Sequence, residues 1–76
     1  MQPREIIKNI ILKWNNEKNL FLVNKIDNCI REGFTGTEIN GMIGRVLEEV
    51  KVMYPDSYEV AKDLIEEYLE YWRNVR

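Results

Sequence analysis

Four carboxylates close together in the last third of the chain are the residues best suited to bind a cation. Asp63, Glu66, Glu67 and Glu70 recur at helical spacing, and side chains three or four residues apart share one side of a helix. Hard cations such as Ca²⁺ prefer oxygen ligands of this kind. The chain nevertheless contains no glycine-centred calcium loop and no histidine, the commonest transition-metal ligand and general base. We therefore expect a solvated acidic surface, with no metal site and no cofactor.

A single cysteine is the only strong nucleophile. Cys29 falls on the apolar side of a predicted helix, without a neighbour that would activate its thiol. Glycine-rich phosphate loops and dinucleotide fingerprints are also absent from the sequence. These features predict that the protein is not an enzyme.

Cysteine usage and hydropathy also bear on location. One cysteine cannot form an intramolecular disulfide, which favours a reducing compartment. Charges at Arg4, Glu5 and Lys8 interrupt the apolar start that a signal peptide needs, and no run approaches the ~20 apolar residues of a membrane span. We expect a cytoplasmic protein that does not enter the membrane.

Apolar residues recur at helical spacing along the whole chain. The pattern predicts an all-α, single compact domain over residues 1–76, a bundle-like or orthogonal array of four amphipathic helices at about 3–15, 19–32, 36–54 and 57–75. Pro3 suits a first helical turn, and Thr35 followed by Glu38 forms a capping-box pattern. Pro55 separates the last two helices, with Asp56 or Ser57 as the expected cap.

The last predicted helix has an unusually wide apolar side. Apolar residues occupy about half of its circumference, whereas a surface helix usually shows a stripe of roughly 100°. We expect Trp72, Ile65, Leu69 and Ala61 to lie in the core. Val60, Tyr71 and Val75, at the edge of this surface, are candidates either for the core or for contact with a partner protein.

Two glycines in the third helix call for a physical reason. Gly41 and Gly44 face away from the main apolar stripe, and each costs roughly 1 kcal/mol relative to alanine inside a helix. They are compatible with a notch where another helix approaches closely, with a helix end and turn at Gly44, or with tolerated surface positions.

The turn interpretation has a recognisable form. Phe34, Thr35, Glu38, Ile39, Ile43 and Gly44 resemble the first helix and turn of helix-turn-helix DNA-binding domains. The resemblance implies a transcriptional regulator, as a monomer or a dimer, that binds DNA through segment 34–53, with Thr35, Arg45 and Lys51 as contacts. This chain departs from the pattern because Asn40 replaces a small residue, Arg45 takes an apolar position, and Glu48 and Glu49 would face phosphates.

Charge distribution favours a protein partner over nucleic acid. Residues 1–33 carry six basic and four acidic residues, a balance of +2, and residues 34–76 carry five basic and nine acidic residues, a balance of −4. An acidic C-terminal half suits a partner with a basic patch better than a phosphate backbone.

We therefore expect a non-catalytic protein-protein interaction module: a small acidic helical adaptor, inhibitor or immunity-type protein of prokaryotic or phage origin. In size and layout the chain is similar to such inhibitors, an analogy that rests on no motif. The alternative is the helix-turn-helix regulator, and self-association is a variant of either. The partner-binding candidates are Glu59, Asp63, Glu66, Glu67, Glu70, Val60, Tyr71, Val75, Gly41 and Gly44.

Overall fold

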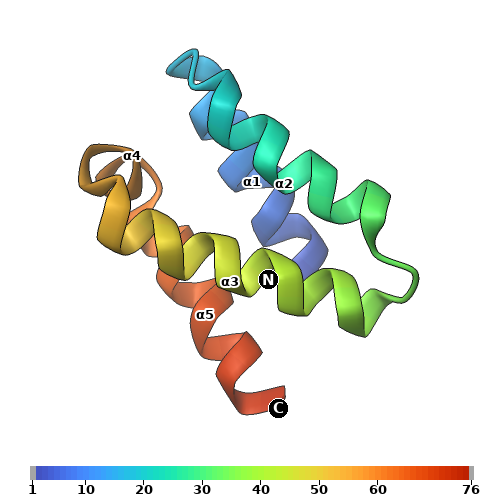
Figure 1. Cartoon of the computed structure of the whole chain (residues 1–76). Coiled ribbons are helices and arrows are strands. Elements are labelled where there is room, and N and C mark those ends of the chain that lie inside the picture. Colours follow the sequence, from blue (N-terminus) through green and yellow to red (C-terminus); the bar gives the residue numbers. More distant parts are fainter. Residues whose placement is uncertain (1, 76) are drawn as a thin grey trace.

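The computed structural model describes residues 2–75, without the side chain of Val75. Helices account for nearly all of these residues, and none of them forms a strand. The helices are α1 (Pro3–Asn16), α2 (Leu20–Glu32), α3 (Gly36–Met53), α4 (Pro55–Val60) and α5 (Lys62–Val75) (Figure 1). The predicted all-α class is confirmed.

Local sequence signals determine where the first three helices begin. Pro3 is the first residue of α1, where its missing N–H leaves no hydrogen bond unmade. The Thr35 hydroxyl accepts a hydrogen bond from the Glu38 amide at 3.1 Å, so the predicted cap of α3 is confirmed. Asn19 caps α2 in the same way, by accepting from the Leu22 amide at 3.4 Å.

The predicted helix over 57–75 is divided in two. It begins earlier than expected, because Tyr54 serves as the N-cap of α4 in place of Asp56 or Ser57, and Pro55 is its first residue. At Ala61 the backbone leaves helical geometry, with φ −125° and ψ 26°. The Ala61 amide bonds to the Tyr58 carbonyl at 3.1 Å, so it does not complete the i to i−4 bond to Ser57.

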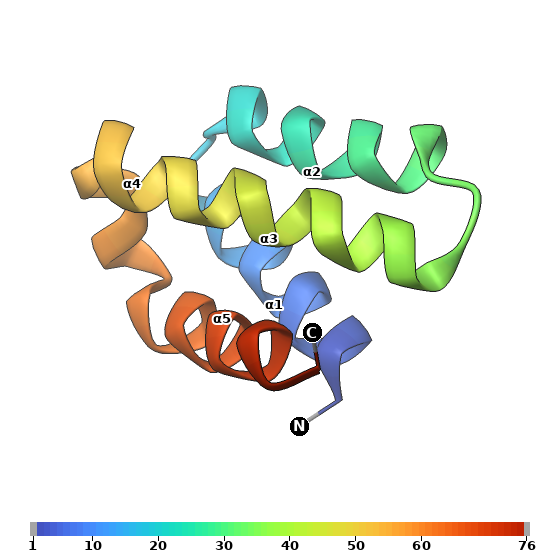
Figure 2. The same cartoon turned by 60° about the horizontal axis from the view of Figure 1, so that its bottom comes forward.

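Four of the helices form a closed ring around the core. Helix α1 packs between α2 and α5, and α3 packs between the same two helices, so α1 and α3 lie diagonally opposite each other. Figure 2 shows α2 and α3 side by side, with the short α4 at the end of α3. The largest fully buried side chains come from α1, α2, α3 and α5: Trp14, Tyr68, Ile6, Ile10, Leu22, Ile26, Leu47, Ile65, Leu69 and Val50.

The break before α5 supplies a hydrogen-bond acceptor to the core. Trp14 is fully buried, and its indole N–H donates to the Ser57 carbonyl at 3.0 Å. That carbonyl is available because the Ala61 amide bonds elsewhere. The Asn19 side-chain amide also donates to the Ser57 hydroxyl at 2.7 Å, so the turn between α1 and α2 is tied to α4. A buried N–H without an acceptor would be strongly destabilising.

We predict that Trp14→Phe lowers the free energy of unfolding by about 2–4 kcal/mol, because it shrinks a buried side chain and removes the donor to Ser57. Chemical denaturation followed by circular dichroism measures the change. Ser57→Ala is the control, since it keeps the carbonyl acceptor and removes only the hydroxyl, for an expected loss of about 1 kcal/mol. Equal losses in the two variants would contradict the role given to the indole.

Candidate protein-binding surfaces

Four of the five predicted carboxylates lie exposed on α4 and α5. Glu59, Asp63, Glu67 and Glu70, here termed the acidic surface, are all accessible to solvent. The last three follow one another at i, i+4 and i+7 and therefore share one side of α5. Glu59 and Asp63 border a hollow of about 280 Å³ that Lys13 and Lys62 also line.

The fifth carboxylate, Glu66, is part of an internal network. Its Oε2 atom accepts a hydrogen bond from the Tyr58 hydroxyl at 2.5 Å and lies 2.9 Å from Lys51 Nζ. These hydrogen bonds, from Tyr58 first and Lys51 second, lower the pKa of Glu66, and the same contact with Glu66 raises the pKa of Tyr58 to about 12. Glu66 therefore connects α3, α4 and α5, and only part of it is available to a partner.

The apolar candidates of the last helix divide between core and surface. Ile65, Leu69 and Ala61 are buried as expected, and Trp72 is half-buried against the core. Val60 is 36% exposed beside the hollow, and Tyr71 is half-buried with its ring 6.1 Å from that of Tyr68. The Val75 side chain lies outside the part of the chain that the structure describes.

The two glycines differ in their surroundings. A Cβ atom built on Gly44 would lie 2.6 Å from Cδ2 of Trp72, whereas one built on Gly41 would meet nothing within 4 Å. Helix α3 continues through both to Met53, which agrees with the predicted helix over 36–54 and excludes the alternative of a turn at Gly44. Gly44 is a notch for close approach, and the residue that fills it is Trp72 of the same chain.

The candidate DNA contacts do not form a helix-turn-helix. Residues 36–53 are one uninterrupted helix, so the second helix that the resemblance implied is missing. Thr35 caps that helix, Arg45 is exposed on it, and Lys51 is paired with Glu66. No observation in the described structure favours duplex binding.

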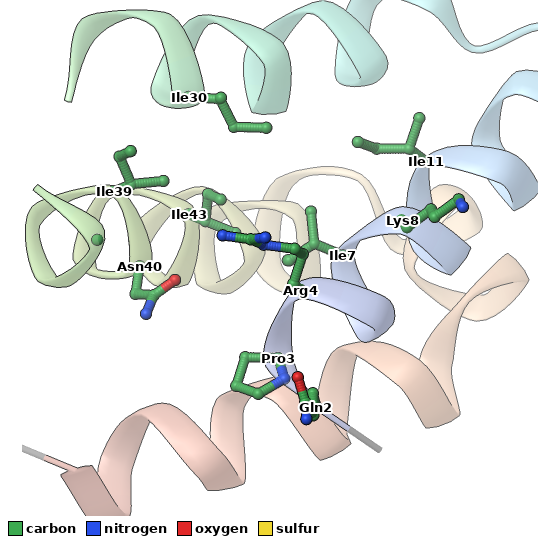
Figure 3. Close-up of a pocket in the computed structure, with 11 residues that line it drawn as sticks. Gln2, Pro3, Arg4, Ile7, Lys8, Ile11, Ile30, Ile39, Asn40 and Ile43 are labelled. Atoms are coloured by element: carbon green, nitrogen blue, oxygen red, sulfur yellow. The ribbon is translucent and has the colours of Figure 1, made fainter. Parts of the chain in front are cut away.

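An apolar groove that the sequence did not predict lies between α1, α2 and α3. Its volume is about 680 Å³, and Figure 3 shows isoleucines of three helices around it, here termed the isoleucine groove: Ile7, Ile11, Ile30, Ile39 and Ile43. Arg4 and Lys8 of α1 also line it. Sequence patterning marked these isoleucines only as apolar helix positions and could not show which of them would remain uncovered.

A separate group of exposed apolar side chains lies where α2 begins and α3 ends. Phe21 is 56% exposed, and its ring is 5.8 Å from that of Tyr54. Lys25 lies 5.5 Å from the centre of the Phe21 ring and 3.0 Å from Glu49, which raises the pKa of the lysine. Phe21 precedes the core residue Leu22 in the sequence, and its exposed fraction shows that it lies at the surface.

The described residues carry few groups arranged for chemistry. Cys29 is buried, and burial raises the pKa of its thiol, which disfavours the reactive thiolate. Among residues 2–75 no three acidic, cysteine or histidine side chains come together in a way that could hold a metal ion. Of the helices described, none has both the length and the apolar character needed to cross a bilayer.

Comparison with known proteins gives no assignment: no protein-family model matches the chain, and neither the curated proteins nor the solved structures contain a significant match. The candidate surfaces must therefore be judged by their own geometry.

We predict opposite effects for alanine at the two glycines. Gly44→Ala should lower the free energy of unfolding by about 1–2 kcal/mol, because displacing Trp72 costs more free energy than alanine gains over glycine in helix propensity. Gly41→Ala is the matched control and should raise it by up to about 1 kcal/mol, since its methyl group enters open space. Thermal unfolding of both variants checks this, and a stabilising Gly44→Ala would refute the close contact.

The Tyr58–Glu66 contact predicts that the tyrosine absorbance spectrum changes at a higher pH than it would without this contact. Tyr58 should ionise with a pKa of about 12, and Glu66→Gln should return that pKa toward 10. Because the raised pKa belongs to the folded state, this contact stabilises the protein below pH 10, and its contribution is lost as the pH rises through 12. Because the folded-state pKa of Glu66 is lowered, its contribution is present above the ordinary glutamate value and is lost at lower pH.

Tyrosinate absorbance during an alkaline titration measures the first effect, with Tyr58→Phe identifying the residue that responds. Tyr68 provides an internal comparison, because its pKa is raised mainly by burial and does not depend on Glu66. An unchanged titration curve in Glu66→Gln would contradict the assignment.

Proposed function

We propose that the protein is a non-catalytic protein-binding module, a small acidic adaptor or inhibitor whose partner carries a basic patch. The observation that supports this most directly is the acidic surface. Four carboxylates remain accessible on α4 and α5, while Glu66, Lys51 and Tyr58 are engaged with one another.

Electrostatics explains how this surface would act. Carboxylates that share one side of a helix attract a basic surface over roughly 8 Å at physiological salt and orient it before contact. Such rim charges contribute mainly to the rate of association and to partner choice. Val60, exposed beside Glu59 and Asp63, adds apolar area at the same place.

The residues best suited to chemistry are used in packing. Cys29 is buried, and the hydroxyl of Tyr68 donates to the backbone carbonyl of Asn40 at 3.0 Å. Their roles in the core support a binding function over a catalytic one. An immunity-type inhibitor of prokaryotic or phage origin fits this proposal, and the cytoplasm is the compartment we infer from the unpaired cysteine.

Neutralising the acidic surface tests the proposal. A variant carrying Asp63→Asn, Glu67→Gln and Glu70→Gln should lose most of the partner capture that the original protein shows at low salt. The matched control carries Glu17→Gln, Glu32→Gln and Glu48→Gln, which removes the same charge from exposed positions on other parts of the molecule. Quantitative affinity capture at low and high salt is the measurement, after circular dichroism has shown that both variants fold.

An equal loss of capture in the two variants would show that the net charge of the protein, and not the acidic surface, is responsible. Retained capture in the first variant would contradict a role for the acidic surface.

A further inference from the structure

The isoleucine groove exists because α1 and α3 lie diagonally opposite each other and do not close on one another. Ile7 and Ile43 are buried at its base, Ile11 and Ile39 are partly covered, and Ile30 of α2 is 44% exposed above them. Figure 3 shows these side chains directed toward a common space from three helices. Part of the apolar lining of this groove is therefore not covered by any other described residue.

The walls of the groove have the length of two helical turns. Arg4 to Ile11 on α1 and Gly36 to Ile43 on α3 are each eight residues, or seven steps of roughly 1.5 Å, and so extend about 10 Å. Side chains at i, i+4 and i+7 of another helix cover the same distance, which is the spacing of anchors in helix-in-groove complexes. A volume of about 680 Å³ accommodates several such side chains.

The charge around the groove has one sign. Arg4 and Lys8 stand one turn apart on α1, and no carboxylate is among the residues that line the space. Within residues 2–75 neither of them forms a salt bridge. In Figure 3 Arg4 points toward the α3 side of the groove, while Lys8 points away from it. On a chain with net charge −2, this is a local positive rim on the α1 side of an apolar floor.

From this geometry and charge we propose that the isoleucine groove binds an amphipathic helix of a partner protein. The helix presents aliphatic side chains at i, i+4 and i+7 to the isoleucines and carries aspartate or glutamate beside them, opposite Arg4 and Lys8. This site is separate from the acidic surface and has the opposite charge preference. The chain thus carries two docking surfaces for two kinds of protein.

A pair of synthetic peptides tests the site directly. The probe is a helical peptide with leucine at i, i+4 and i+7 flanked by glutamates. The matched control peptide has lysine in place of every glutamate. Titration into isotopically labelled protein, followed by amide chemical shifts, should place the glutamate peptide on the residues lining the groove. The lysine peptide should bind at least roughly tenfold more weakly, because it faces the positive rim.

Variants of the protein separate the apolar contribution to peptide binding from the electrostatic contribution. Ile30→Asp should weaken the glutamate peptide at least roughly tenfold by placing a charge at the partly exposed wall. Val52→Asp is the control, since Val52 is an equally apolar but 78% exposed residue outside the groove. Arg4→Glu combined with Lys8→Glu should reverse the preference and favour the lysine peptide. The variant neutralised at Asp63, Glu67 and Glu70 should bind the glutamate peptide unchanged, so this test is independent of the proposed function.

Several results would overturn the inference. Shifts confined to α4 and α5, equal affinity for the two peptides, or no shift at millimolar peptide would each exclude an acidic helix as the occupant. Laurate that binds the groove more tightly than the peptide would indicate a small amphiphile. A dimer in light scattering that Ile30→Asp dissociates would show that a second copy covers the groove.

Discussion

The hydrogen bond from the Trp14 indole to the Ser57 carbonyl is the constraint on which the arrangement of this protein depends. A tryptophan at the centre of a small helical domain contributes much apolar area, yet its N–H must find an acceptor there. Inside a regular helix every carbonyl is already committed to its own backbone. The interruption of the helix at Ala61 leaves the Ser57 carbonyl free to accept this bond and changes the direction of the last helix. As a result, α4 packs at the end of α3 and α5 packs along α1 and α3.

Once α5 is redirected, its wide apolar side is shared by two neighbouring helices. Trp72 lies over Gly44, where only a hydrogen occupies the place of a side chain, and Tyr68 reaches the Asn40 carbonyl. Glu66, on the polar side of the same helix, is tied to Tyr58 and Lys51. The width of the apolar arc is therefore explained largely by packing within the chain. Glu59, Asp63, Glu67 and Glu70 stay exposed to solvent on α4 and α5, and this makes the acidic surface a candidate for recognition.

The same ring of helices leaves a space open between α1, α2 and α3. Helices α2 and α5 each bridge α1 and α3, and their side chains fill the centre, but the beginnings of α1 and α3 stay apart around the isoleucine groove. A domain of 76 residues has little apolar area to leave uncovered. Ile30 nevertheless stays 44% exposed in a groove that Arg4 and Lys8 also line, and the partner we propose for this groove differs from the one we propose for the acidic surface.

Capping and hydrophobic periodicity act within one or two turns, so the sequence predicts the helical class, the starts of α1 and α3 at Pro3 and Thr35, the end of α3 before Pro55, and most of the core. It could not determine the break at Ala61, since the indole that uses the released carbonyl lies 43 residues from Ser57. Three further outcomes needed the tertiary structure for the same reason: the occupant of the Gly44 notch, the engagement of Glu66, and the groove between α1 and α3. Each depends on which helix surfaces meet, and an amphipathic pattern states only that a surface is apolar, not what covers it.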